Sequence, residues 1–428
     1  MADPGPASLR SLLAANTSFR SLWLARLLSF LGDSVGLIAL LLYTADRYGS
    51  GLAVALLMIA GDFVPSLLSP VAGAISDRWD RRLVMVSCEV GQGAILAVVA
   101  LTLPSLPLLL VLVAVQSCVA AVFQPASRSV VPSLVPSGDL ERANALIGFG
   151  TNGVDSAGPL AGAALLAWLS VRDLLLVDVA TFAISAGLLL TIHVLTGRLE
   201  PTARGPGSMR GLLAEARAGL TYLWRNPALR VITLAFCAVV LFNGVDDVAL
   251  VFLARHALHG SNSAASLVYA GAGLGLLAGF LLLARVGPRL AMPLLILAGY
   301  AVSSAGNLLT GVAVTILAAL GFQVVRGLGI AGMDVGHTTL IQRLVPPEML
   351  GRVFGNVYGA VGAAAGLSYV FGGLLLDATN ARVTLIVAGS GGLVAAGLAS
   401  LALPAALRRA VPAEADGGAG GGADGAPA

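Results

Sequence analysis

The chain of 428 residues contains no lysine, so all 25 of its basic residues are arginine. The absence of lysine excludes Schiff-base chemistry and phosphate binding by a lysine side chain. Charged residues make up only 11% of the chain, whereas they make up about 25% of an average soluble domain. A soluble protein of this length would have too few charges to cover its surface, so an ordinary cytosolic enzyme is excluded.

Cysteine and histidine are also scarce. The three cysteines, Cys88, Cys118 and Cys237, lie in apolar runs without metal-ligand spacing, so neither a disulfide framework nor a zinc site is predicted. The four histidines form no constellation, and no catalytic triad order or nucleotide-binding loop is present. We therefore predict no enzyme activity and no metal or cofactor. The net charge of +3 and the lack of a long basic cluster also exclude a nucleic-acid partner.

Hydrophobic sequence is what the chain has in abundance, at 57% of all residues and a mean hydropathy of +0.91. A membrane-spanning helix needs about 20 apolar residues, and runs of that length recur down the whole chain. We predict an all-α, polytopic protein of the lipid bilayer, monomeric, with 12 transmembrane helices in two sets of six. The predicted spans are 20–44, 52–75, 83–103, 106–127, 143–168, 173–195, 229–253, 264–284, 290–311, 314–341, 352–376 and 383–404.

The connection between the sixth and seventh spans is the longest in the chain. Apolar residues at helical spacing between Met209 and Trp224 predict a short amphipathic helix there, lying at the cytoplasmic interface. The predicted parts are an N-terminal six-helix bundle at 1–195, a cytoplasmic linker at 196–228, a C-terminal six-helix bundle at 229–404 and a disordered cytoplasmic tail at 405–428.

Arginine counting predicts the orientation. If both termini are cytoplasmic, 19 arginines fall in cytoplasmic segments and 4 in outer loops. Cytoplasmic loops of membrane proteins carry an excess of basic residues, so the count favours a multi-pass protein with both termini in the cytoplasm. The four outer arginines are Arg47, Arg172, Arg255 and Arg382.

A short pattern occurs twice. Residues 134–142 and 344–352 share Leu-Val-Pro-x-x-x-Leu-x-Arg at an offset of 210 residues, in each case after the fourth helix of a half. Two homologous halves related by an axis along the membrane normal are typical of alternating-access transporters with a site between the halves. The alternative is a common loop that connects two helices without wider homology.

Residues 73–82 read Gly-Ala-Ile-Ser-Asp-Arg-Trp-Asp-Arg-Arg. This segment resembles the signature loop G-x-x-x-D-R-x-G-R-R of the major facilitator superfamily, with Asp80 in place of the second glycine. The chain is similar along its length to the branch of bacterial enterobactin exporters and macrolide efflux proteins, with further matches that begin at Phe19, Phe123, Gly219 and Gln342. The resemblance implies a major facilitator fold of two pseudo-symmetric six-helix bundles in a bacterial cytoplasmic membrane.

The resemblance also implies a cytoplasmic gate. Its acidic residue, Asp77, would contact the start of the eleventh helix when the cytoplasmic side is closed, which favours the outward-facing state. Glycine in the loop lets the second helix pack closely, and the arginines hold the cytoplasmic face or serve as plain anchors at anionic headgroups. The predicted gate residues are Gly73, Asp77, Arg78, Arg81, Arg82, Gly351 and Arg352.

The fifth span contains Gly158-Pro159-Leu-Ala-Gly162, which partly matches the fifth-helix G-P-x-x-G-G pattern of proton antiporters, with Ala163 at the last glycine. Gly158 and Gly162 form a small-residue face with a proline kink between them. Such a face packs closely against a neighbouring helix and would seal against proton leak. General helix packing is the alternative interpretation.

Charged residues inside the membrane are candidates for a transport site, because each costs at least about 2.5 kcal/mol at the bilayer centre. Asp33, Asp62, Asp155 and Arg326 are predicted near the middle of their spans, and Asp334 lies nearer the cytoplasmic side. Burial favours the neutral form of a carboxyl group and makes it a workable proton carrier. Asp33 is the first candidate, and Arg326 is the expected counter-charge from the opposite half. A static salt bridge or a polar cavity lining is the alternative.

Four further acids are not selected as candidates for the transport site. Asp246 and Asp247 are placed toward the outer end of the seventh span and interpreted as a gate or loop feature. Asp178 is interpreted as a possible helix cap, and Glu89 is placed nearer the cytoplasmic side.

These features predict a secondary active transporter that exports amphipathic small molecules, such as drugs, antibiotics or siderophores, by alternating access and proton antiport. Transport of lipid-like or other metabolites, uptake included, is an alternative, and a non-transporting receptor or scaffold is a third. The lack of a nucleotide-binding motif argues against a primary pump. A scaffold has no reason to bear the cost of buried acids.

Overall fold

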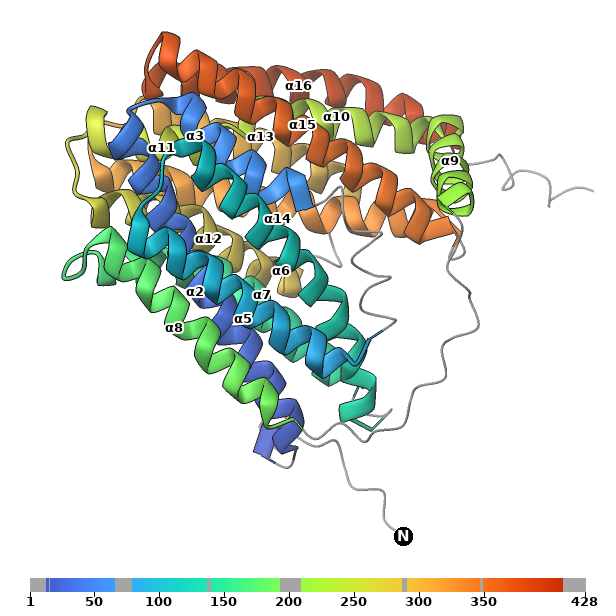
Figure 1. Ribbon diagram of the computed structural model, residues 1–428. Coiled ribbons are helices and arrows are strands. Elements are labelled where there is room, and N and C mark those ends of the chain that lie inside the picture. The colour runs from blue at the N-terminus through green and yellow to red at the C-terminus, as the bar shows by residue number, and fades with distance from the viewer. Residues whose placement is uncertain are drawn as a thin grey trace, which may run out of the picture.

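The computed structural model describes residues 13–14, 16–65, 79–136, 140–192, 209–286, 291–346 and 349–410, and every regular element in these ranges is a helix (Figure 1). The elements are α2 (Thr17–Tyr48), α3 (Gly51–Met58), the π-helix η1 (Ile59–Phe63), α5 (Arg81–Thr102), α6 (Leu106–Leu134), α7 (Leu140–Leu165), α8 (Val171–Leu190), α9 (Met209–Arg225), α10 (Pro227–Asn243), α11 (Asp246–Phe252), the π-helix η3 (Leu253–Ala257), α12 (Asn262–Val286), α13 (Met292–Gly311), α14 (Ile316–Leu344), α15 (Leu350–Ala378) and α16 (Ala381–Ala410).

Ten helices within the described ranges are long and apolar enough to cross a membrane, so the predicted all-α, multi-pass fold is confirmed. The other two predicted spans correspond to α7 and to α3 with η1, which the structure describes only up to residue 65. The seventh span consists of α10, α11 and η3 in succession. The last helix continues to Ala410, past the predicted end at 404. The predicted disorder of the tail lies outside the described residues from 411 onward.

The helices pack as two halves that meet at one end of the molecule. In the first half α2 packs on α7 and α8, and α5 packs on α6 and α8. In the second half α14 packs on α12 and α13, and α16 packs on α10 and α13. Between the halves, α7 contacts α12, α3 contacts α15, and α11 contacts α2 and α3. Figure 1 shows the two halves converging at the left and diverging toward the right.

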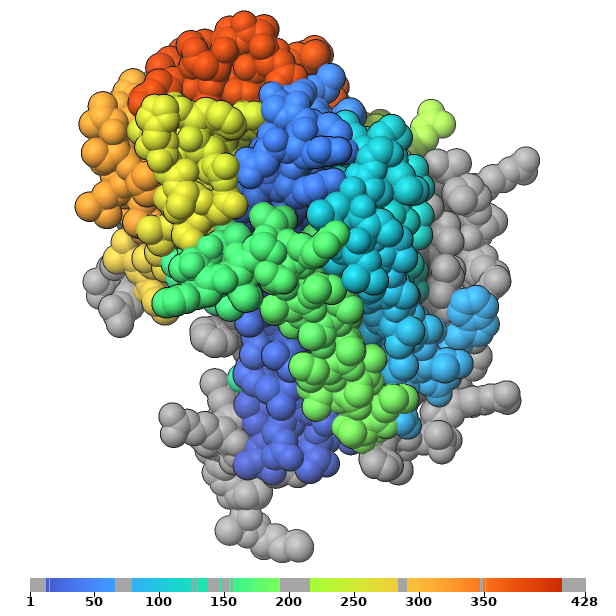
Figure 2. All heavy atoms as spheres, turned by 60° about the vertical axis from the view of Figure 1, so that its left-hand side comes forward, coloured from blue at the N-terminus to red at the C-terminus, as the bar shows by residue number. Residues whose placement is uncertain are grey.

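The hydrophobic cores follow this division. The largest core spans both halves at the end that carries the α2–α3 and α15–α16 connections, the joined end, and it includes Leu41, Val54, Val248 and Leu385. At the opposite, divergent end, the first half and the second half have separate cores. Figure 2 shows the joined end, where the blue surface of α3 abuts the yellow and red surfaces of the second half. Apolar burial therefore fastens the halves together at one end only.

The two copies of the Leu-Val-Pro pattern occupy the same structural position. Helix α6 ends at Leu134 and α14 ends at Leu344, and the next residue is extended in both cases. A residue before proline is driven out of the helical conformation, which explains the common end point. The carbonyl of Leu134 accepts a hydrogen bond from Asn16 Nδ2 at 2.5 Å, and that of Leu344 accepts one from the Tyr222 hydroxyl at 3.1 Å.

Polar caps repeat at the same offset of 210 residues. Asn16 caps the start of α2 and Asn226 caps the start of α10. The Arg172 guanidinium donates to the carbonyls that end α5, at 2.9 Å from Ala100 O. Arg382 donates in the same way at the end of α13, at 2.6 Å from Ala313 O. The two halves are therefore pseudo-symmetric in their helix ends as well as in the short sequence repeat.

The amphipathic helix α9 packs on the divergent end of the second half (Figure 1). Leu223 is buried there among residues of α14 and α15. The backbone carbonyl of Ala216 accepts a hydrogen bond from Asn356 Nδ2 on α15 at 3.0 Å. Gly219 lies against the Arg352 carbonyl, at a distance that a side chain would not allow. The linker helix is thus attached to the second half.

Candidate functional site

A buried ion pair joins Arg326 on α14 to Asp246 at the start of α11. Only 1% of the Asp246 surface is exposed. Both residues belong to the second half, so the expected pairing of Arg326 with an acid of the first half is wrong. The physical reason is that helix seven breaks at Gly244–Val245, which brings the Asp246 carboxylate to the face of α11 toward α14. Each charge in such a buried site needs the other as its partner, because an isolated buried charge is strongly destabilising.

Amide side chains surround this ion pair. Asn307 on α13 donates to Asn243 Oδ1 at 2.9 Å and to Asp246 Oδ2 at 3.5 Å. Asn243 donates to Ser304 Oγ at 2.9 Å, and Gln323 donates to Thr310 Oγ1 at 3.1 Å. The second half therefore contains a charge pair held in a hydrogen-bond network, in which Gln323 Oε1 and Arg326 Nε stay without a partner.

The first half holds a different polar cluster, formed by Asp33 on α2, Glu89 on α5 and Asp178 on α8. The three carboxyl groups are close enough to interact electrostatically. Glu89 and Asp178 are buried and Asp33 is half-buried. Both carboxylate oxygens of Glu89 lack a hydrogen-bond partner, although Ser29 and Ser185 lie beside it. An unpartnered buried acid is expensive in its charged form.

Asp178 approaches α2 closely because glycine occupies two positions opposite it. A Cβ at Gly32 or at Gly36 would collide with the Asp178 carboxylate. Thr181 on the same helix donates a hydrogen bond to Asp178 Oδ1 at 3.2 Å. Asp178 lies within helix α8, which Ser170 caps, so its interpretation as a helix cap is wrong.

Arg26 supplies the positive charge near these acids. Its guanidinium donates to Ser127 Oγ and to Gln124 Oε1 on α6, the latter at 3.4 Å, and it stacks over the Phe30 ring at 4.9 Å. It also interacts electrostatically with Glu89. Of the three carboxyl groups, Glu89 is thus the one that interacts with the Arg26 guanidinium.

A third polar group lies where the halves meet. Tyr369 on α15 donates to Asp62 Oδ2 on η1 at 3.4 Å, which is a long hydrogen bond between the halves. Asp247 on α11 lies within hydrogen-bonding reach of the Tyr269 hydroxyl on α12 and interacts electrostatically with Asp62. The Asp62 side chain is exposed. The first and second halves therefore bring two acids and two tyrosines toward one another.

A seam between α3 and α15 continues from Asp62 to the joined end. The Asp377 carboxylate accepts hydrogen bonds from Ser50 Oγ at 2.8 Å, from Leu52 N at 3.1 Å and from Gly51 N. It therefore satisfies backbone donors that the first turn of α3 leaves unpaired. Gly373 lies between this contact and Tyr369, and a Cβ there would stand 3.0 Å from the Gly51 carbonyl oxygen.

Two other contacts close the joined end. Arg255 on η3 pairs with Asp46 on α2 at 3.0 Å. Ser266 Oγ on α12 donates to the Pro159 carbonyl on α7 at 2.7 Å. The predicted small-residue face of the fifth span lies at this crossing. A Cβ at Gly158 would collide with Ser34 on α2, and one at Gly162 would stand 3.0 Å from Ser266 Oγ.

The predicted gate is described only in part. Gly73, Asp77 and Arg78 lie outside the described residues. Asp80, the departure from the family loop, accepts a hydrogen bond from Leu83 N at 2.9 Å and caps the start of α5. Aspartate is a preferred residue for this role, which explains why it can replace glycine.

The described gate residues lie at helix starts of the divergent end. Arg81 and Arg82 begin α5, and the Arg82 guanidinium donates to the Leu190 carbonyl at the end of α8. Gly351 and Arg352 are in the first turn of α15.

Two other predicted site residues lie apart from these networks. The Asp155 side chain on α7 is outside the described part of the structure. Asp334 on α14 is half-buried, two turns from Arg326 toward the divergent end. The residues that sequence reasoning underrated are Glu89, Asp178, Asp246 and Asp247, along with the partner residues Tyr269, Tyr369 and Asn307. All four acids lie inside membrane spans, and the free-energy cost of a charged residue there is the signal in the sequence that could have identified them.

A family model of the Major Facilitator Superfamily matches residues 22–255 and 246–423, so the chain belongs to this superfamily of transporters. The chain is 28% identical over 89% of its length, and 89% of the relative, to an uncharacterized MFS-type transporter of Bacillus subtilis, YfiS. It is 22% identical over 87% of its length, and 92% of the relative, to macrolide efflux protein A of Streptococcus pyogenes. The predictions of the superfamily and of a non-enzymatic protein are confirmed.

Solved structures share the fold at low sequence identity. A POT family transporter in complex with 5-aminolevulinic acid has a TM-score of 0.73 at 11% identity, with 91% of this chain and 97% of that chain covered. A bacterial homolog of the human lysosomal transporter Spinster, inward-facing and unoccupied, has a TM-score of 0.71 at 17% identity, with 94% and 99% covered. The predicted major facilitator fold is confirmed.

Proposed function

We propose that the protein is a monomeric exporter of amphipathic small molecules in the bacterial cytoplasmic membrane, driven by proton antiport. Its substrates are drug-like compounds, antibiotics or siderophores. The similarity to a macrolide efflux protein along most of both chains supports efflux, as does the proposed place of this chain in the branch of enterobactin exporters and macrolide efflux proteins. The observation that carries proton coupling is the group of three interacting carboxyls in the first half.

The divergent end faces the cytoplasm in this proposal. It carries most of the arginines, as cytoplasmic segments do. The described arrangement is then inward-facing, with the joined end closed toward the outside. Three of the four outer arginines have structural roles at the joined end, because Arg172 and Arg382 cap helix ends and Arg255 pairs with Asp46.

Export requires the joined end to open while the divergent end closes. The seam between α3 and α15 and the crossing of α7 with α12 would separate, and the gate of Asp77, Arg78, Arg81 and Arg82 would form against the start of α15. Glycine at positions 158 and 162 allows the α7 crossing to re-form without a large barrier, because no side chains need to be displaced.

Protons are proposed to bind at Asp33 from the outside and to leave on the cytoplasmic side while substrate moves outward. Neutralising Asp33 removes one of three like charges that repel within the cluster. Asp62 and Asp155, together with Arg326 and Asp334, are proposed to line the path of substrate or proton between the halves. Tyr369 would sense the charge of Asp62, because its hydrogen bond to a carboxylate is stronger than one to a neutral acid.

The test is export from inside-out membrane vesicles that are energised with a proton gradient. The substrates are a macrolide, a cationic dye and a catecholate siderophore. We expect proton-driven export of at least one of them, with Asp33→Asn and Asp62→Asn each reducing it at least about tenfold, which corresponds to about 1.4 kcal/mol in the transport barrier. The matched control is Asp173→Asn, which removes an acid of the first half that bonds only Ser170 at the start of its own helix.

Two results would contradict the proposal. If Asp33→Asn and Asp62→Asn both leave proton-driven export intact, the coupling assignment is wrong. If deletion of the gene changes neither antibiotic susceptibility nor siderophore secretion, the exporter assignment loses its support.

A further inference from the structure

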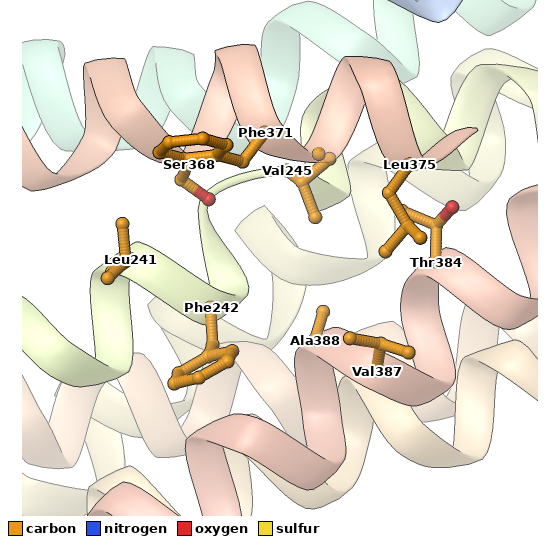
Figure 3. A pocket seen from close by; sticks show the side chains of 10 residues that line it. Leu241, Phe242, Val245, Ser368, Phe371, Leu375, Thr384, Val387 and Ala388 are labelled. Atoms are coloured by element: carbon orange, nitrogen blue, oxygen red, sulfur yellow. The ribbon is translucent and has the colours of Figure 1, made fainter. Parts of the chain in front are cut away.

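A lateral pocket of about 250 Å³ lies between α10, α15 and α16, on the outside of the second half (Figure 3). All three helices belong to membrane-crossing segments. At its rim, Phe371 is 62% exposed and Val387 is 42% exposed. Since these side chains face the surroundings of transmembrane helices, the pocket opens sideways, toward the lipid.

Two hydroxyl groups line this pocket, and they differ in one respect. Thr384 donates to the Asn380 carbonyl of its own helix at 2.9 Å. Ser368 is only 2% exposed, and its Oγ has no hydrogen-bond partner. A serine in a membrane helix usually donates to a carbonyl three or four residues earlier. The free Ser368 hydroxyl points into the pocket in Figure 3 and stays available to a ligand.

The chemistry of the lining limits what can bind. The described residues around the pocket carry no charge, so a charged group would be left without a partner in an apolar site. The volume of about 250 Å³ is below the roughly 300–1,000 Å³ of sites that enclose a whole drug-sized ligand. The pocket therefore fits one end of a larger molecule, and that end must carry one oxygen that can bond Ser368.

The pocket lies directly behind the broken helix. Val245 forms part of its wall, and the next residue, Asp246, pairs with Arg326 on the opposite side of the helix. Ser368 touches the break itself, since a Cβ at Gly244 would stand 3.0 Å from the Ser368 Cβ. Discontinuous transmembrane helices form substrate sites in many transporters. A ligand that presses on Val245 would act on the residue next to the buried ion pair.

We propose that this pocket binds one end of a neutral amphiphile dissolved in the bilayer, through apolar contacts and one hydrogen bond between the Ser368 hydroxyl and a ketone, ester, ether or hydroxyl oxygen of the ligand. This proposal rests on the proposed function. It says that the exported substrate has an uncharged end and that this end first contacts the protein on the lipid side of the second half. A phospholipid acyl chain has no such oxygen at its buried end and is the competing occupant.

The test uses the full-length protein in lipid nanodiscs and photolabelling with a hexadecanol that carries a diazirine near its hydroxyl group. A hexadecane with the same diazirine and no hydroxyl is the matched probe. We expect saturable labelling by the alcohol at residues 241–245 and 384–388, reduced by unlabelled hexadecanol. Ser368→Ala should lower this labelling about fivefold, as expected for one hydrogen bond, and should leave labelling by the alkane unchanged.

A pair of tryptophan variants controls for position. Val387→Trp fills the mouth of the pocket and should reduce labelling by the alcohol at least fivefold. Val394→Trp places the same side chain two turns further on the same face of α16, outside the pocket, and should leave labelling unchanged. Thermal unfolding of each variant checks that it is folded.

The proposal is overturned if the alkane or a diazirine phosphatidylcholine labels these residues as strongly as the alcohol, which would identify an ordinary lipid site. Equal effects of Val387→Trp and Val394→Trp would also overturn it. The labelling experiment does not depend on transport. If the pocket is labelled saturably but the protein shows no export activity, only the proposed function is contradicted. Export without saturable labelling would contradict the pocket alone.

Discussion

The two halves share their helix ends but differ in their buried polar groups. Asn16 and Asn226, and Arg172 and Arg382, perform the same capping roles 210 residues apart. At the same offset, Asp33 corresponds to Asn243, and Arg326 corresponds to Gln116. The positions of Glu89 and Asp178 hold Gly299 and Ala388 in the second half.

This difference separates two kinds of polar interior. The second half balances Asp246 with Arg326 inside an amide network. The first half gathers three acids that interact with one another, and one guanidinium interacts with Glu89 among them. A symmetric frame therefore supports two different polar interiors, and under the proposed proton antiport it is the acids of the first half that bind protons.

The largest effect is expected from Arg326→Gln, which copies Gln116 of the first half. The variant leaves the Asp246 carboxylate buried without its partner, and breaking such a pair costs about 3–5 kcal/mol. We expect a large fall in the thermal unfolding temperature of the detergent-solubilised protein. The double variant Arg326→Gln with Asp246→Asn should recover most of the loss. Equal unfolding temperatures for the single variant and the wild type would show that the pair is not needed for a stable second half.

Arg172→Ala and Arg382→Ala test the shared frame. Each arginine donates charge-assisted hydrogen bonds to carbonyls at a helix end, and each substitution should cost about 1.5–3 kcal/mol. Unfolding temperatures of the two variants, measured side by side, should fall by similar amounts. A fall in only one of them would mean that the helix ends are equivalent in position but not in energy.

Asp377→Ala should have a smaller effect on stability and a visible effect on conformation. The loss of three hydrogen bonds across the seam loosens the joined end, so that the arrangement closed at this end becomes less populated. We expect a several-fold faster reaction of a cysteine placed at Leu52 with a membrane-impermeant maleimide. Thr379→Ala, in the next turn of the same connection, is the control and should leave the rate unchanged.

Glu89→Gln is expected to have the smallest effect on stability, within about 0.5 kcal/mol or slightly stabilising, because neither carboxylate oxygen of Glu89 has a partner to lose. The same change removes one acid from the cluster of the first half, so the pH dependence of export should shift while the unfolding temperature stays constant. A marked loss of stability would mean that Glu89 holds the fold together and takes no part in coupling.

Much of the frame could be predicted from the sequence. Long apolar runs define helices, and the Leu-Val-Pro pattern predicted two homologous halves because proline ends both helices at the same register. The partner of Arg326 could not be predicted. Hydropathy indicates how deep in the membrane a residue lies. The side of the helix on which Asp246 lies depends on the break at Gly244–Val245, and that break depends on packing against α15 and α16.

The acid cluster was underestimated for a related reason. Asp33, Glu89 and Asp178 are far apart in sequence and lie on three helices, and their proximity depends on Gly32 and Gly36, which admit Asp178 to the surface of α2. Each acid could be identified alone by its cost in the membrane. Their meeting is a property of helix packing, which the pattern of one helix does not contain.

Asp377 has a consequence for how the sequence can change over time. Two of the three groups it binds are backbone N–H groups, of Gly51 and Leu52, and every residue except proline supplies such a donor. Substitutions at Leu52 other than proline therefore leave the contact intact, whereas an apolar residue at position 377 removes all three hydrogen bonds. This contact across the seam thus tolerates most substitutions at Leu52 and is lost by a single substitution at Asp377 in the second half.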